Sequence, residues 1–120
     1  MTYNAYILDW TTKEYEMLKQ KLKKANFDFI KEKNKLHIRV RVSFDRVEEF
    51  SSIVKSHLNA EYNYVDIQFP HEKKTVIVFS GELAFISNPT ENEAVRKWAI
   101  AKGLPPKQAD WRTSYIKPRK

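Results

Sequence analysis

The side chains from position 36 to position 42 alternate strictly between two kinds. One set of positions is apolar and the other is basic: Leu36, Ile38, Val40 and Val42 against His37, Arg39 and Arg41. Because successive side chains of a strand point to opposite faces of its sheet, this pattern predicts a strand with one apolar and one basic face. The chain is therefore expected to build a sheet that packs against a core on one side and presents cations on the other.

Other segments in the first part of the chain have the apolar spacing of strands or helices. Strands are expected at 3–8, 27–31, 35–42 and 61–69, and helices at 11–25 and 45–59. Each helix is expected to begin at a capping box, Thr11 with Glu14 and Asp45 with Glu48. The predicted order of elements is β-α-β-β-α-β.

This order resembles the ferredoxin-like arrangement, in which both helices cover one face of an antiparallel sheet. The resemblance covers positions 3–69 of the chain. The RNA-recognition motif shares the topology, but its third strand carries a glycine and two stacking aromatics where this chain has Leu36, His37 and Arg39. The likeness to that motif therefore stops at the topology.

The last part of the chain is expected to lengthen the sheet and add a helix. Strands at 75–79 and 82–87 are followed by a helix that Thr90 and Glu93 cap and that Gly103 ends. The predicted fold class is thus α+β, with a ferredoxin-like core, an antiparallel strand extension and a C-terminal helix.

Aromatic residues continue beyond the third predicted helix. The packing face of that helix consists of Val95, Trp98 and Ala99. Trp111 follows shortly after, so this segment is expected to pack back onto the body of the protein rather than to form a free tail. We predict a single domain over residues 1–116 and a basic, disordered tail over residues 117–120.

Composition and spacing argue against several kinds of site. With no cysteine and two glycines, the chain lacks thiolate metal sites, disulfides and the glycine-rich loops that hold phosphates. His37, His57 and His71 lack the spacing at which two imidazoles share a metal. No purely apolar run exceeds four residues, which predicts a cytoplasmic protein without a membrane span. We therefore expect no cofactor, no metal and no catalytic residue.

The formal net charge of +7 is concentrated in two segments. Residues 13–41 carry ten Lys and Arg against four acids, and residues 107–120 carry five against one. A basic field of this kind attracts polyanions, and each phosphate that it neutralises releases counterions. Nucleic acid is therefore the expected partner.

The 61–69 strand is expected to place Tyr62 and Tyr64 on the same face as the basic residues. Tyrosine rings stack on unpaired bases, and guanidinium groups bind phosphate through paired hydrogen bonds. The expected interface combines these tyrosines with six cationic residues: His37, Arg39, Arg41, Lys23, Lys24 and Lys35. We predict a basic, non-enzymatic nucleic-acid-binding module, with RNA ahead of DNA.

The sequence leaves three alternatives open. The 75–115 extension or a second subunit would cover the basic face, with the arginines paired to acids such as Asp66 and Glu82. A protein-interaction or regulatory subunit would bind an acidic protein partner, alone or as a homodimer. A metal-dependent nuclease is the third, because Asp9 stands where some small ferredoxin-like CRISPR-associated nucleases hold a metal-binding aspartate.

Overall fold

The computed structural model describes residues 1–30, 37–109 and 111. These residues form an α+β fold with the element order β-α-β-β-α-β-β-β-α. The helices and strands are β1 (Thr2–Leu8), α1 (Tyr15–Lys24), β2 (Asp28–Ile30), β3 (His37–Ser43), α2 (Val47–Val54), β4 (Tyr64–Phe69), β5 (Lys74–Phe79), β6 (Leu83–Ile86) and α3 (Pro89–Ala101). The predicted order of elements is confirmed, with ends shifted by a few residues.

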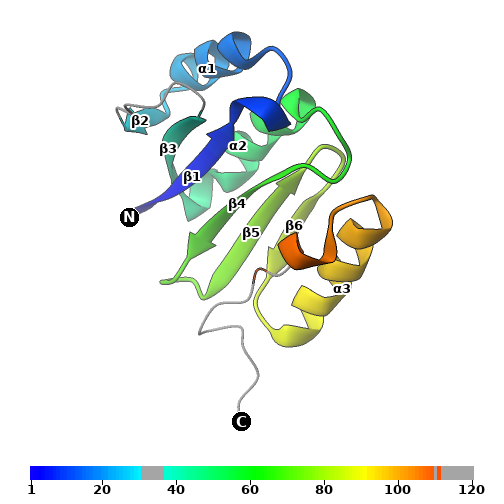
Figure 1. Cartoon of the computed structure of the whole chain (residues 1–120). Coiled ribbons are helices and arrows are strands. Elements are labelled where there is room, and N and C mark those ends of the chain that lie inside the picture. The colour runs from blue at the N-terminus through cyan, green and yellow to red at the C-terminus, as the bar shows by residue number, and fades with distance from the viewer. Residues whose placement is uncertain (31–36, 110, 112–120) are drawn as a thin grey trace.

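The strands form two three-stranded antiparallel sheets. The first has the order β1-β3-β2 and the second the order β4-β5-β6. β1 and β4 lie side by side, so the two sheets meet along these strands (Figure 1). The predicted alternation in β3 is confirmed at Val40, Arg41 and Val42, whereas His37, Ile38 and Arg39 are all half-buried and Leu36 lies outside the described residues.

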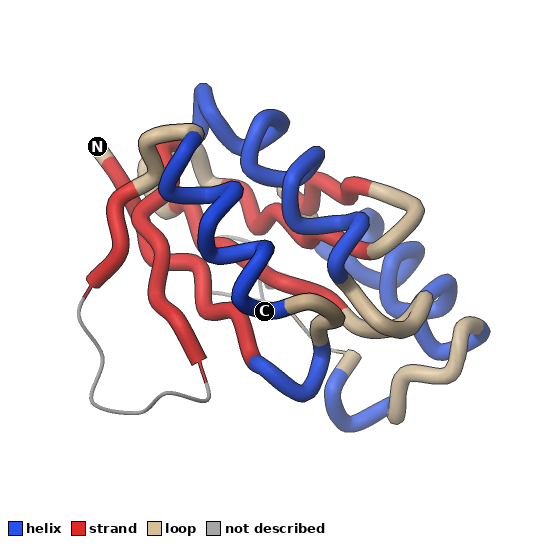
Figure 2. The backbone as a smooth tube through the Cα atoms, turned by 90° about the horizontal axis from the view of Figure 1, so that it is seen from above, coloured by secondary structure: helices blue, strands red, loops and turns tan. Residues whose placement is uncertain are grey.

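α1 and α2 cover one face of the two sheets. Leu22 of α1 and Phe50 of α2 are fully buried in an apolar core with Val40 of the first sheet and Ile67 of the second. The two helices lie side by side over the strands (Figure 2). Burial of this apolar surface, at about 25 cal/mol per Å², is the main force that holds the helices on this face.

α3 covers the opposite face, over the second sheet. Val76 and Val78 of β5 belong to the first core, whereas the alternating Ile77 and Phe79 belong to a second core. Residues from α3 and the segment after it complete the second core: Ala99, Leu104, Ala109 and Trp111. The prediction that the chain after the third helix packs back onto the body is therefore confirmed at Trp111. The extension covers the face of β5 and β6, not the face of β3 that carries Arg41.

Two of the predicted capping boxes are wrong because short 3-10 turns precede the helices. α1 begins at Tyr15, with Glu14 at its N-cap in the left-handed region (φ 53°). Thr11 instead ends a 3-10 turn, where its Oγ1 donates to the Leu8 carbonyl at 2.9 Å. Asp45 lies inside another 3-10 turn, and neither α1 nor α2 has a side-chain hydrogen bond from its N-cap.

The cap of α3 is formed by Asn88 rather than by Thr90. The Asn88 side chain accepts a hydrogen bond from the Glu91 backbone N–H at 2.8 Å, and Pro89 occupies the first helical turn. Glu91 Oε1 accepts from the Ser87 backbone N–H at 2.9 Å and from Ser87 Oγ at 2.6 Å. Proline suits the first turn of a helix because the N–H groups there have no partner within the helix. With Asn88 as its cap, α3 therefore starts before the predicted capping box of Thr90 and Glu93.

Replacing Glu91 with glutamine is expected to remove a pH-dependent part of the stability. Hydrogen bonds from the side chain and backbone of Ser87 hold the pKa of Glu91 below its usual value of 4.5. A lowered folded-state pKa adds stability above the unfolded-state pKa, and this contribution is lost as pH falls through the lowered value. In urea unfolding of the parent and Glu91→Gln, the parent's advantage at neutral pH should shrink below about pH 4.5. An advantage that stays constant with pH would contradict this account.

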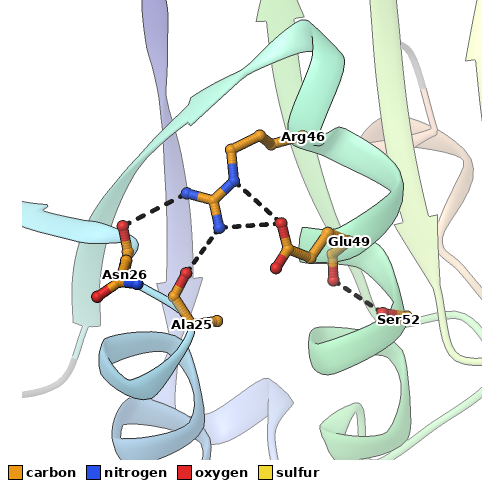
Figure 3. Close-up of polar contacts among 5 residues, drawn as sticks. All are labelled: Ala25, Asn26, Arg46, Glu49 and Ser52. Atoms are coloured by element: carbon orange, nitrogen blue, oxygen red, sulfur yellow. Dashed lines mark hydrogen bonds and ion pairs between the residues drawn. The ribbon is translucent and has the colours of Figure 1, made fainter.

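Arg46 joins the end of α1 to the start of α2 (Figure 3). Its Nη2 donates to the Ala25 carbonyl at 2.6 Å, and Nη1 donates to the Asn26 carbonyl at 3.4 Å. Nε donates to Glu49 Oε1 at 3.0 Å, and the guanidinium carbon lies 3.9 Å from the centre of the Phe27 ring. All of these contacts lie within the fold, so Arg46 stabilises the packing of α1 against α2.

His57 is buried, with 3% of its surface exposed, and it joins α1 to the segment after α2. Its Nε2 lies 3.0 Å from Lys21 Nζ and its Nδ1 lies 2.9 Å from the Lys13 carbonyl. An ammonium group only donates and a carbonyl only accepts, so we assign the ring proton to Nδ1. His57 therefore stabilises the packing of α1 against the segment after α2.

Candidate nucleic-acid interface

The face of the first sheet opposite α1 and α2 carries the predicted arginines. In the register of β1 and β3, Tyr6 lies opposite Arg39 and Asn4 lies opposite Arg41. The guanidinium carbon of Arg39 is 5.4 Å from the centre of the Tyr6 ring, a distance typical of a cation-π contact. The ring centres of Tyr6 and His37 are 6.4 Å apart. One cross-strand cluster therefore combines aromatic and cationic groups.

Three aromatic side chains near the junction of β1 and β4 are exposed to solvent. The exposed fractions are 48% for Tyr6, 64% for Trp10 and 37% for Tyr62. Tyr6 belongs to β1, Trp10 to the 3-10 turn that follows β1, and Tyr62 to the turn before β4. A cluster of large exposed rings is a common sign of a surface that meets a ligand or a partner.

The same three rings line a hollow of about 440 Å³. The hollow is bordered by the end of β1, the beginning of β4 and the segment Gly103–Pro105 after α3. Gly103 has a φ of +116°, and a Cβ at this position would lie 3.1 Å from Cδ1 of Tyr62. Glycine therefore lets the chain turn out of α3 and pass close to Tyr62, and the prediction that Gly103 ends the third helix is confirmed.

Asp66 adds a carboxylate to the lining of the hollow. Its Oδ2 is 3.4 Å from Nε2 of Gln68, and Oε1 of Gln68 accepts a 2.7 Å hydrogen bond from Thr75 Oγ1. Burial is the largest influence and raises the pKa of Asp66, while hydrogen bonds from Gln68 and from its own backbone act in the opposite direction. The hollow thus has aromatic sides and a carboxylate hydrogen-bond acceptor in its wall.

Tyr62 and Tyr64 both line the hollow, although the structure places them in different surroundings. The prediction that both belong to one strand is wrong, because β4 begins at Tyr64 and the Asn63 N–H closes a turn onto the Ala60 carbonyl. The ring of Tyr64 is half-buried and meets Trp111 edge-on, with ring centres 5.3 Å apart. Tyr62 therefore offers the more accessible ring, and Tyr64 links the hollow to the second core.

Lys23 and Lys24, two of the three predicted lysines, lie away from this cluster. Lys23 and Lys24 lie in the last turn of α1, whose Leu22 packs into the core on the other face of the sheet. Lys23 Nζ lies 5.5 Å from the centre of the Phe29 ring. Lys35 falls outside the described residues. Arg39 and His37 contact Tyr6, which lines the hollow, and Arg41 lies on the same strand, whereas the two helical lysines lie on the opposite side of the sheet.

Three residues of this surface were missed in the sequence. Tyr6 is out of phase with the buried Ala5 and Ile7, just as Arg39 is out of phase with Val40, so its outward position was readable from the alternation. Asp66 is likewise out of phase with the buried Val65 and Ile67, but its place in the hollow, like that of Trp10, depends on how the two sheets meet.

Glu82 and Asp9 belong to the alternative interpretations of the sequence. Glu82 lies between β5 and β6 rather than beside the arginines of β3. In the part of the chain that the structure describes, no three His, Asp or Glu residues are grouped as metal ligands, so Asp9 lacks such partners there.

No family model, curated protein or solved structure matches this chain, so the candidate interface rests on its own geometry. None of the helices within the described residues is long and apolar enough to cross a membrane.

Proposed function

We propose that the protein is a small, non-enzymatic module that binds single-stranded nucleic acid, RNA ahead of DNA, on the open face of β1 and β3. The observation that carries this proposal is the exposed ring of Tyr6 beside Arg39, on the strand pair that also carries Arg41 and that leads into the exposed Trp10. Stacking on an aromatic ring and neutralisation of phosphates are the two interactions on which binding of single strands depends.

The arrangement of the strands is consistent with this proposal. With β1 and β4 side by side, the strands follow the order β2-β3-β1-β4, which is the order of a ferredoxin-like sheet. In this interpretation β5 and β6 lengthen the sheet beyond β4. α3 covers the face opposite α1 and α2, but only over the second sheet. The uncovered half, over β1 and β3, is then the surface on which a strand of nucleic acid lies.

Alanine at Tyr6 or Trp10 is expected to weaken binding of single strands by roughly 1–3 kcal/mol for each ring that stacks on a base. Binding of a duplex of the same sequence should change little, because its bases are already stacked on one another. Fluorescence anisotropy with a labelled single strand and its duplex measures both affinities. Met17→Ala is the matched control, since Met17 is an exposed apolar residue (47%) on α1, away from this face.

Two results would count against the stacking proposal. Equal losses for single strands and duplexes would indicate general charge attraction rather than stacking. An acidic polypeptide that binds the parent, and whose affinity falls in the alanine variants as much as that of the single strand, would favour an acidic protein partner.

A further inference from the structure

The hollow at the junction of β1 and β4 differs chemically from the rest of the open face. Its volume of about 440 Å³ lies within the range of roughly 300–1,000 Å³ that is usual for ligand pockets. Tyr6, Trp10 and Tyr62 supply aromatic walls, which suit a flat heterocycle. Asp66 supplies a negative group, which does not suit the phosphate backbone. The lining therefore favours a base over a phosphate.

The carboxylate of Asp66 receives a weak hydrogen bond from the side chain of Gln68. Thr75 Oγ1 donates to Oε1 of Gln68, which turns the amide Nε2 of Gln68 toward Oδ2 of Asp66. The resulting contact between Nε2 and Oδ2 is long, at 3.4 Å. Asp66 therefore retains capacity to accept stronger hydrogen bonds from a group that enters the hollow.

The Watson–Crick edges of the bases differ in the number of adjacent donors. Guanine presents two neighbouring donors, N1–H and the N2 amino group, whereas uracil presents one N–H between two carbonyl groups. Adenine and cytosine each present one amino group beside an acceptor nitrogen. An ionised carboxylate only accepts, through two oxygens, so the edge of guanine is the one that matches it.

We infer that this hollow binds a guanine base of a single strand, with the rings of Tyr6, Trp10 and Tyr62 around it and the carboxylate of Asp66 accepting from N1–H and N2. This inference rests on the proposed function and adds a base preference to it. Arg39 and Arg41, on the neighbouring strand, would hold the phosphates on either side of the bound nucleotide.

Burial of Asp66 supports the same conclusion. Burial raises the pKa of the group, which means that the ionised form is poorly solvated in the free protein. Two N–H donors would stabilise the charge where water does not, and charge-assisted hydrogen bonds in such surroundings are stronger than neutral ones.

The experiment compares uridine oligomers of equal length that differ at one central position. The central nucleotide is guanosine, inosine, adenosine or uridine, and anisotropy gives the affinity of the unchanged protein for each. Inosine keeps N1–H and lacks the N2 amino group, so it isolates the second donor. We expect the guanosine oligomer to bind at least about fivefold more tightly than the other three, since a bidentate contact to a base discriminates by this factor or more.

Asp66→Asn is expected to reduce this preference to less than about twofold, because an amide has a single acceptor oxygen and adds a donor group that faces the donors of guanine. Glu82→Gln is the matched control, since it removes the same charge between β5 and β6, and it should keep the full preference. Thermal melts of both variants test whether they fold. The inosine comparison uses the parent protein, so it tests the inference even if Asp66→Asn unfolds.

The outcomes separate this inference from the proposed function. Equal binding of all four oligomers, or a preference that survives in Asp66→Asn, would overturn the inference and leave the proposed function standing. Failure to bind any of them would overturn both. Free guanosine monophosphate should compete poorly with the guanosine oligomer. If it bound as tightly as the oligomer, the ligand of the hollow would be a free nucleotide and not a single strand.

Discussion

Trp111→Ala is expected to destabilise the protein by about 3–5 kcal/mol, which is the usual cost of removing a buried tryptophan side chain. Trp111 is 5% exposed and meets Tyr64 and Phe79 edge-on, with ring centres 5.3 Å and 6.1 Å away. Since a domain of this size is stable by roughly 5–15 kcal/mol, the loss is a large fraction of the total. Urea unfolding followed by circular dichroism gives the free energy directly.

A matched variant separates the loss of packing from the loss of the indole itself. Trp111→Phe keeps an aromatic ring in contact with Tyr64 and Phe79, so it should lose clearly less stability than the alanine variant. A Trp111→Ala protein that unfolds at the same urea concentration as the parent would contradict the burial of Trp111 in the second core. If that protein also lost binding of a partner, this segment would be a recognition element instead.

The double variant Arg39→Ala with Arg41→Ala is expected to weaken binding of single strands by about tenfold or more at low salt. The loss of two phosphate contacts should also reduce the salt dependence of the affinity by roughly one to two units in the slope of log K against log salt. The fold should remain intact, because both side chains are on the face opposite the first core. Titrations at several salt concentrations give the slope.

Lys23→Ala with Lys24→Ala is the control for this prediction. It removes the same number of charges from α1, on the other side of the sheet, so its effect on the slope should be smaller. Equal slopes for the two double variants would show that binding follows net charge and does not select the face of β3. That result would indicate that Lys23 and Lys24 contribute to binding as much as the arginines of β3 do.

The sequence contains most of the local information about the fold. Strict alternation made β3 and its two faces predictable, because a strand buried on one side must keep its apolar residues in phase. The start of α3 was misplaced because Asn88 and Pro89 together make a stronger cap than the Thr90 box. The start of β4 was misplaced because apolar and aromatic residues continue the alternation into a turn that includes Tyr62.

The candidate site was predictable only where it depends on one strand. Arg39 and Arg41 could be assigned to the outer face from β3 alone. The hollow requires β1 beside β4 and the turn at Gly103 beside Tyr62, and both are contacts between residues distant in sequence. No periodicity within a single segment encodes such contacts, so the alternation assigns Asp66 to a face of its strand but not to a pocket.

The most direct test of the central claim is a titration of isotopically labelled protein with a single-stranded oligonucleotide, in which NMR monitors the chemical shifts of the backbone amides. The account predicts that the largest shifts fall on β1, on β3 and on residues around the hollow, including Trp10 and Tyr62. The solvent face of α1 should be affected least. Shifts centred on Lys23 and Lys24, shifts spread evenly over the surface, or no shifts at all would contradict binding of a single strand on the open face of β1 and β3.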